Sequence, residues 1–257
     1  MKRPLILVTN DDGVEARGIQ CLIEAVFPLG EVVVVAPDGP RSAQSNAITV
    51  NSPLRFWKHL EKEGLTVYRC NGTPTDCVKI ALCHILEQKP DLLVSGINHG
   101  SNSSASVMYS GTMGAAFEGC RAGISSLAFS LCDFDPRADF TFAMEFATML
   151  SGKVLKESLP NGVCLNVNVP AVKNIKGLRL CRQADAKWTE RFVQREDPAG
   201  NNYYWLTGFL ENKEPNADDT DEAALEQGYV SVVPCKVDLT DYHALSNLKK
   251  WNYETKV

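Results

Sequence analysis

Two short, purely apolar runs with an amphipathic segment between them constrain the fold of this chain more than any other feature. Residues 5–8 and 32–36 are typical of strands that are buried on both faces of a parallel sheet. Strand, helix and strand at this spacing predict a right-handed βαβ unit with parallel strands. The apolar residues of the predicted helix recur at the spacing of one helix face: Ile19, Leu22, Ile23, Val26 and Phe27.

The same alternation continues towards residue 170. Helices are predicted over residues 75–86, 111–122 and 140–158, and strands over residues 92–95, 127–130 and 163–169. This order predicts an α/β fold, with a Rossmann-like, doubly wound and mostly parallel sheet in residues 1–170.

After Pro170 the alternation fades, and residues 171–257 are expected to form a C-terminal extension of β-rich and helical pieces that mediates association between subunits. Within it, the acidic stretch 218–222 is most simply a solvated loop. The aromatic cluster 203–205 is more typical of strand packing than of a ligand platform.

The net charge, the hydropathy and the cysteine pattern argue against a nucleic-acid-binding protein, a membrane protein and a disulfide-bonded protein. The formal net charge of −5 provides no basic surface for a nucleic-acid polymer, although a small anionic substrate remains possible. No apolar stretch approaches the roughly 18 residues that a membrane span requires. The nine cysteines are scattered and include no Cys-x-x-Cys pair, which indicates reduced thiols. We therefore expect a cytoplasmic protein without membrane contact.

Three polar loops follow three of the predicted strands, at residues 9–13, 37–46 and 96–102. Ligands of such sheets bind at the carboxyl ends of the strands, so the three loops should meet there. Asp11 and Asp12 repel each other, and keeping both ionised near a buried edge requires a cation or strong donors. Oxygen ligands suit Mg²⁺ or Mn²⁺ better than Zn²⁺. Taken alone, Asp-Asp-Gly is more simply a turn that caps the following helix, and only the three loops together favour a metal.

A fourth segment, residues 109–116, places hydroxyls and small residues at a predicted helix start. The free N–H groups and the dipole of such a start favour a phosphate group, although capping alone would account for Ser110. Residues 72–76 form a similar but weaker pattern, in which Thr75 is the predicted N-cap.

Several familiar site patterns do not occur. The chain has no Gly-x-x-x-x-Gly-Lys-Ser/Thr, no Gly-x-Gly-x-x-Gly and no Gly-x-Ser-x-Gly, which argues against phosphate-loop NTPases, dinucleotide enzymes and the usual serine nucleophile of α/β-hydrolases. Its four histidines include no metal-binding pair. His84 is interpreted as structural, and a catalytic role for His99 is the minor alternative.

Five segments together resemble one family: residues 8–13 (VTNDDG), 40–46 (PRSAQSN), 71–78 (NGTPTDCV), 95–102 (SGINHGSN) and 109–112 (YSGT). In order and content they are similar to the motifs of SurE, the stationary-phase survival protein family of metal-dependent nucleotidases. One departure is that residues 103–107 read Ser-Ser-Ala-Ser-Val, where the family usually has Leu-Gly-Asp-Asp-Val.

The resemblance implies a divalent metal ion in each subunit, held by Asp11, Asp12, Ser42 and Asn98, and the oxygen ligands make Mg²⁺ or Mn²⁺ the expected ion. The two aspartates are also the candidate catalytic residues. It implies hydrolysis of nucleoside 5′-monophosphates, often with 3′-nucleotidase and short-chain exopolyphosphatase activity. It also implies a C-terminal part exchanged between the subunits of a homodimer or homotetramer. The phosphate group is expected to contact a further set of residues: Ser45, Asn46, Asn102, Ser110, Gly111 and Thr112.

The expected reaction is direct attack of water on the phosphate, with the metal neutralising charge and with Asp11 or Asp12 assisting proton transfer. Two alternatives stay open. One is a broad phosphomonoesterase or exopolyphosphatase whose substrate is not a nucleotide. The other is a non-catalytic module that senses phosphate or nucleotide, which would explain the aspartate pair but not the hydroxyl and amide loops.

Overall fold

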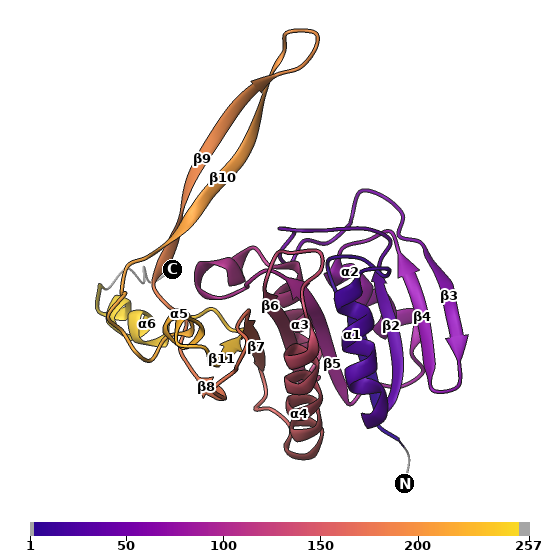
Figure 1. Cartoon of the computed structure of the whole chain (residues 1–257). Coiled ribbons are helices and arrows are strands. Elements are labelled where there is room, and N and C mark those ends of the chain that lie inside the picture. The colour runs from indigo at the N-terminus through magenta and orange to yellow at the C-terminus, as the bar shows by residue number, and fades with distance from the viewer. Residues whose placement is uncertain (1–2, 252–257) are drawn as a thin grey trace, which may run out of the picture.

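The computed structural model describes residues 3–251 and contains one large sheet with helices on both faces (Figure 1). Most neighbouring pairs among its nine strands are parallel. The strand order is β3-β4-β2-β1-β5-β6-β7-β11-β8, in which the outer strands are β3 (Phe56–Lys62), β4 (Leu65–Cys70), β11 (Val230–Lys236) and β8 (Leu178–Leu180). The predicted strands are present as β1 (Leu5–Thr9), β2 (Glu31–Pro37), β5 (Leu92–His99), β6 (Ser126–Cys132) and β7 (Val163–Pro170). The predicted α/β class with a mostly parallel sheet is confirmed.

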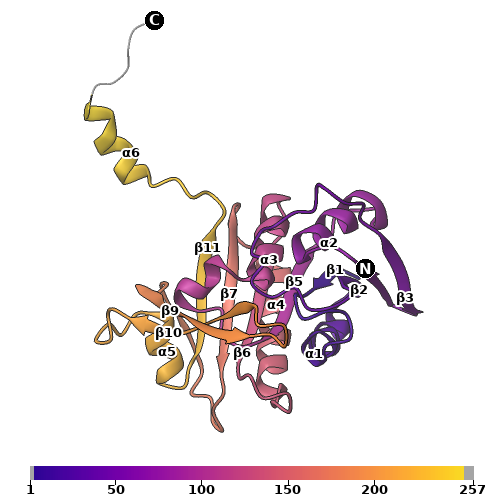
Figure 2. The ribbon, with the colours of Figure 1, turned by 90° about the horizontal axis from the view of Figure 1, so that it is seen from above.

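The apolar residues of β1 pack into two different cores because successive side chains point to opposite faces of the sheet. On β1, Ile6 and Val8 pack with α1 (Arg17–Val26) and α4 (Thr141–Glu157). Leu5 and Leu7 pack on the other face with α2 (Pro74–Ile80) and α3 (Gly111–Arg121). Figure 2, which views the sheet from above, shows α1 and α2 on its opposite sides.

Two elements before α2 differ from the sequence prediction. An antiparallel pair, β3 (Phe56–Lys62) and β4 (Leu65–Cys70), was not predicted, because β3 is exposed along its whole length and shows no apolar alternation. The N-cap of α2 is Thr73 rather than Thr75, so that prediction was wrong. The Thr73 hydroxyl accepts a hydrogen bond from the Asp76 N–H, and the Asp76 carboxylate accepts one from the Thr73 N–H, which is a capping box.

The predicted helix over residues 75–86 is α2 followed by a single π-helical segment, Ala81–Ile85, which carries an exposed His84. Short 3₁₀ helices cover Phe27–Leu29, Ser104–Met108 and Lys249–Trp251. Among residues 3–251, no helix has the length and apolar character needed to cross a membrane.

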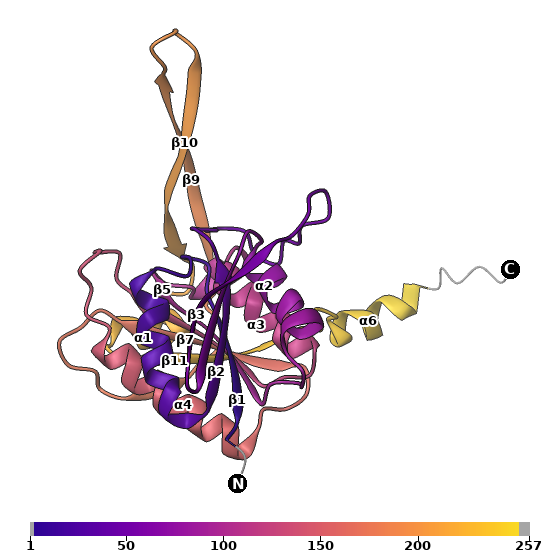
Figure 3. The same cartoon turned by 90° about the vertical axis from the view of Figure 1, so that its right-hand side faces the viewer.

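The sheet does not end at residue 170. Two strands from the expected extension, β8 (Leu178–Leu180) and β11 (Val230–Lys236), continue the main sheet beyond β7. The parts that leave the sheet are a long antiparallel hairpin, β9 (Ala186–Glu196) with β10 (Asn202–Asn212), and the helix α6 (Tyr242–Leu248). Both project from the body of the molecule (Figure 3). The boundary expected from sequence at residue 170 therefore falls inside one continuous sheet.

The acidic stretch 218–222 is not wholly a solvated loop, and the prediction was wrong at Asp221. This residue begins α5 (Asp221–Glu226) and is 1% exposed. Its carboxylate accepts hydrogen bonds from the backbone N–H groups of Ser104, at 2.7 Å, and Ala184, at 2.9 Å. Glu222 beside it accepts a hydrogen bond from the Ser103 hydroxyl at 2.6 Å. The burial is tolerated because hydrogen-bond donors face the carboxylates.

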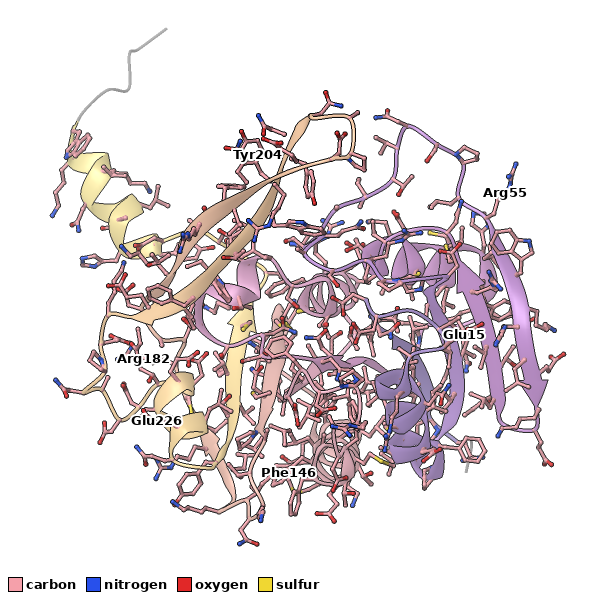
Figure 4. The ribbon with its side chains drawn as sticks, turned by 45° about the horizontal axis from the view of Figure 1, so that its top comes forward. Glu15, Arg55, Phe146, Arg182, Tyr204 and Glu226 are labelled. Carbon is pink, nitrogen blue, oxygen red and sulfur yellow. The ribbon has the colours of Figure 1, made fainter. Side chains whose placement is uncertain are left out.

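The aromatic cluster 203–205 lies on β10, so it belongs to a strand, but it does not pack into a core of its own chain. Tyr203, Tyr204 and Trp205 are all exposed. Figure 4 shows Tyr204 on the projecting part of the hairpin, away from the main sheet. All nine cysteines are free thiols, as expected from their scatter in the sequence.

Candidate metal and phosphate site

The loop after β1 is shaped by the buried Asn10. Its side-chain amide donates to the carbonyl of Gly13 at 2.9 Å, and its carbonyl oxygen accepts from the Gly13 N–H at 3.2 Å. This closed turn holds the two residues between them, Asp11 and Asp12, at the carboxyl end of β1. The next loop is tied to the same place, because the Arg41 N–H donates to the carbonyl of Asp11 at 2.7 Å.

The side chain of Arg41 stiffens the loop after β2. Its guanidinium donates to the carboxylate of Asp38 at 2.9 Å and to the carbonyl of Asn71 at 3.2 Å. Because both ends of Arg41 are anchored, the next residue, Ser42, is held beside the aspartate pair.

Asn98 is aimed by an irregularity in β5. Residue Ser95 pairs with Ala128 of β6, whereas Asn98 pairs with Ser130, so β5 has one extra residue. Such a bulge redirects the side chains that follow it. The Asn98 amide nitrogen then donates to the carbonyl of Gly100 at 2.8 Å, which fixes the amide plane and leaves its oxygen at the opposite side.

A cavity of about 580 Å³ at this edge of the sheet is lined by all four residues predicted to hold the metal, Asp11, Asp12, Ser42 and Asn98. The side chains come from three loops that are far apart in sequence. Two of the predicted phosphate contacts, Asn102 and Ser110, line the same cavity. The base of the β9–β10 hairpin and Phe134 also line it.

The surroundings of the two carboxylates disfavour their charged forms. Asp11 is 5% exposed, and burial raises its pKa from 3.8 to about 6, an effect that the charge of Asp12 increases and a hydrogen bond from Thr112 opposes. Burial also raises the pKa of Asp12, while the His99 backbone N–H, 3.3 Å from Oδ2, opposes that rise. A divalent cation between the carboxylates would relieve both effects.

The donor set fits a hard cation. Within residues 3–251, no cluster of three or more His, Cys, Asp or Glu side chains is placed to bind a metal. A cation here would therefore complete its shell with the Ser42 hydroxyl, the Asn98 amide oxygen and water. All-oxygen shells with retained water are typical of Mg²⁺ and Mn²⁺.

The N-terminus of α3 lies directly against Asp11. Ser110 caps the helix, since its hydroxyl accepts from the Met113 N–H at 3.0 Å. The Thr112 hydroxyl donates to Asp11 Oδ1 at 2.6 Å, so this side chain orients a predicted metal ligand instead of facing the cavity. At Gly111, a Cβ atom would lie 2.9 Å from the Asp11 Cβ, which explains the absence of a side chain there.

The remaining predicted phosphate contacts are engaged with neighbouring elements. The Ser45 hydroxyl donates to the Met108 carbonyl at 2.8 Å, and both Ser45 and Asn46 lie against Gly114 of α3. The Asn102 side chain donates to the Ser130 hydroxyl at 2.8 Å. In the described part of the chain, four of the predicted phosphate contacts do not line the cavity: Ser45, Asn46, Gly111 and Thr112.

Sequence reasoning missed the hairpin side of the cavity. Trp188 and Glu190 of β9, together with Leu206, Thr207 and Gly208 of β10, line it. The alternating pattern of residues 186–196 and 202–212 around Asp197-Pro198-Ala199-Gly200 indicates a hairpin. No local signal indicates which loops the base of that hairpin will face.

Comparison with known proteins identifies a matching family. The sequence model of the family described as "Survival protein SurE" matches residues 6–190 of this chain. A relative from Phocaeicola vulgatus named 5′-nucleotidase SurE is 48% identical over 253 residues, covering 98% of this chain and 98% of the relative. One of the same name from Flavobacterium johnsoniae is 53% identical over 254 residues and 97% of both chains. The crystal structure of the SurE protein from Aquifex aeolicus is similar with a TM-score of 0.82 and 37% identity, covering 96% of this chain and 99% of the other.

Proposed function

This chain belongs to the SurE family, and we propose that it is a metal-dependent 5′-nucleotidase that converts nucleoside 5′-monophosphates to nucleoside and phosphate. Nucleoside 3′-monophosphates are proposed as secondary substrates. The observation that carries the proposal is the convergence of Asp11, Asp12, Ser42 and Asn98 on one cavity. Curated relatives about half identical over nearly their full length bear the name 5′-nucleotidase, which supports the same reaction.

The four converging residues would hold one Mg²⁺ or Mn²⁺ per subunit. Such an ion supplies neutralisation of phosphate charge and orientation of the attacking water. Thr112 holds Asp11 through Oδ1, and the His99 N–H holds Asp12 through Oδ2, so both carboxylates have fixed positions before the substrate arrives. Asp11 and Asp12 are the proposed catalytic residues, and one of them would assist the proton transfer from the attacking water.

The phosphate group is proposed to lie at the start of α3. The free N–H groups and the dipole of an 11-residue helix attract an anion there. Ser110 and Asn102 line the cavity beside it and are the proposed phosphate contacts. Ser45, Asn46, Gly111 and Thr112 are proposed to support this site through their packing against α3 and Asp11.

The projecting parts support a homodimer or homotetramer, which we propose as the working state. The hairpin exposes Phe192, Trp205 and Phe209, and α6 exposes Leu245 and Leu248. Large exposed apolar surfaces mark association sites. The region 171–257 is thereby proposed to mediate association. The nine free thiols favour a cytoplasmic location, where thiols stay reduced.

A phosphate-release screen tests the activity. Wild-type protein would be assayed with AMP, GMP, CMP, UMP, 3′-AMP and tripolyphosphate, each with Mg²⁺, with Mn²⁺ and with EDTA. We expect the highest kcat/KM with a 5′-monophosphate and no turnover with EDTA. A highest kcat/KM with tripolyphosphate would favour the exopolyphosphatase alternative. No release from any substrate with either metal would favour a sensing module.

A further inference from the structure

The cavity has two chemically different sides. Part of its lining consists of the carboxylates and hydroxyls described above, whereas another part, here called the mouth because its residues are much more exposed, consists of large apolar side chains. Trp188 is 42% exposed, Leu206 is 58% exposed and Phe134 is 80% exposed. A phosphate group does not bind favourably to such surfaces, whereas covering them with another apolar or aromatic group is favourable.

Trp188 is held in place on the hairpin. Its indole N–H donates to the Ser106 hydroxyl at 3.3 Å, which links the base of β9 to the Ser104–Met108 turn. Glu190 lies two residues further along the same face of β9, and Gly208 of β10 stands directly opposite Glu190. Trp188, Glu190 and Gly208 all line the cavity, so this face of the hairpin is turned towards the metal and phosphate loops.

Phe134 belongs to the loop after β6 and lies on the backbone of the loop that carries Asn98. A Cβ atom at Gly100 would lie 2.3 Å from the Phe134 ring, so the ring rests directly on this glycine. An aromatic surface thus stands within two residues of a proposed metal ligand. The distance from phosphate to base in a nucleotide is bridged by one ribose, which the cavity of about 580 Å³ can contain.

We infer that Trp188 is the base-stacking residue of this enzyme, and that the nucleobase binds at the apolar mouth formed by Trp188, Leu206 and Phe134. The inference rests on the proposed nucleotidase function and adds the part of the substrate that a metal and phosphate site does not recognise. Stacking accepts any base, because every base has a π-face. The site therefore binds all nucleobases and favours purines, which offer the larger ring area.

Two substrates that differ only in the nucleobase measure the contribution of the base to catalysis. AMP and ribose 5-phosphate share the sugar and the phosphate, and only AMP carries a nucleobase. For Trp188→Ala we expect kcat/KM to fall about tenfold with AMP, mainly through KM, and to stay unchanged with ribose 5-phosphate. Trp188→Phe retains a ring but loses the hydrogen bond to Ser106, and it should recover most of the activity on AMP. Trp57→Ala on β3 is the matched control, since Trp57 is 47% exposed and belongs to the far edge strand.

The possible results distinguish a failure of the proposed base-binding subsite from a failure of the proposed nucleotidase function. Equal losses with both substrates would overturn the inference, because Trp188 would then support the whole cavity; no loss with AMP would overturn it as well. Adenosine binding to the EDTA-treated protein, measured by equilibrium dialysis, needs no turnover. Weaker adenosine binding by Trp188→Ala than by wild type supports the subsite even if no phosphate is released, a result that would count against the proposed function alone. Equal adenosine binding by the two proteins would overturn the subsite.

Discussion

The hydroxyl of Thr112 donates a hydrogen bond of 2.6 Å to Oδ1 of Asp11, a residue 101 positions earlier in the chain. Both side chains are buried. The contact joins the first turn of α3, where the phosphate is proposed to bind, to a proposed metal ligand at the end of β1. Positioning of the metal and of the phosphate is therefore linked through a single hydroxyl.

Thr112→Val keeps the size of this side chain and removes its donor. We expect the Kd for Mn²⁺ to rise about 10- to 100-fold, which is typical when a hydrogen bond that orients a metal ligand is lost. Turnover at saturating Mn²⁺ should change less. Thr75→Val is the matched control, because Thr75 is buried in α2 and its hydroxyl has no hydrogen-bond partner among the described residues. Calorimetric titration with Mn²⁺ measures the Kd of each variant. An unchanged Kd in Thr112→Val would refute the role of Thr112 in positioning Asp11.

Gly111→Ala introduces a methyl group 2.9 Å from the Cβ of Asp11, so Asp11 has to move. We expect phosphate release to fall and the free energy of unfolding to drop by about 1–3 kcal/mol, as for other overpacked sites. Gly152→Ala in α4 is the control, because the nearest atom to its new methyl group is 3.7 Å away. That change should stabilise the protein by about 0.5–1 kcal/mol. Urea unfolding measures both, and a fully active Gly111→Ala protein would show that this close contact is unimportant.

The stability gained from metal binding should depend on pH. Burial raises the pKa of Asp11 from 3.8 to about 6. The folded, metal-free protein therefore holds this proton more tightly than the unfolded chain, and its stability falls as the pH rises from about 4 to about 6. A cation needs the ionised carboxylate, so the increase in Tm on adding Mn²⁺ should be small at about pH 5 and large at about pH 7.5. Equal increases at both pH values in thermal unfolding scans would contradict this.

Asp221→Ala should destabilise the part of the structure that joins the C-terminal region to the cavity. The change leaves the buried N–H groups of Ser104 and Ala184 without their acceptor. We expect a loss of about 2–4 kcal/mol in the free energy of unfolding, as two unpaired buried donors would cost. Asp218→Ala, at an exposed position three residues earlier, should change it little. Similar unfolding midpoints in urea for the two variants would mean that the Asp221 hydrogen bonds contribute little.

Local sequence patterns predicted the strand before Asp11 and the helix after it, because the periodicity of a strand or a helix is visible in residues that are close in sequence. The convergence of Ser42 and Asn98 on the aspartate pair was also predictable, since parallel strands end at the same edge of the sheet. The role of Thr112 was not, because a threonine at a helix start has the same sequence signature whether it faces a phosphate or a buried carboxylate. The burial of Asp221 likewise depends on N–H groups more than 30 residues away.

The position of Trp188 shows the same limit. Its strand alternation is visible in the sequence, but the Ser106 hydroxyl that holds its indole is 82 residues away. The departure from the family at residues 103–107 also gains a physical meaning only in the folded chain. There, the Ser103 hydroxyl donates to the Glu222 carboxylate, whereas Ser104 donates to Asp221 through its backbone N–H, a contact that any residue except proline could make.

The central claim is that the aspartate pair holds a metal that the hydrolysis of a nucleotide requires, and Asp12→Asn tests it most directly. Asparagine still offers an oxygen to the His99 N–H and removes a charge that burial disfavours. The far-UV circular dichroism spectrum of the metal-free protein should therefore match wild type, and its Tm should be no lower. Phosphate release from AMP at saturating Mn²⁺ should fall at least about 100-fold, close to the level of wild type in EDTA. Full turnover by Asp12→Asn under these conditions would contradict the account.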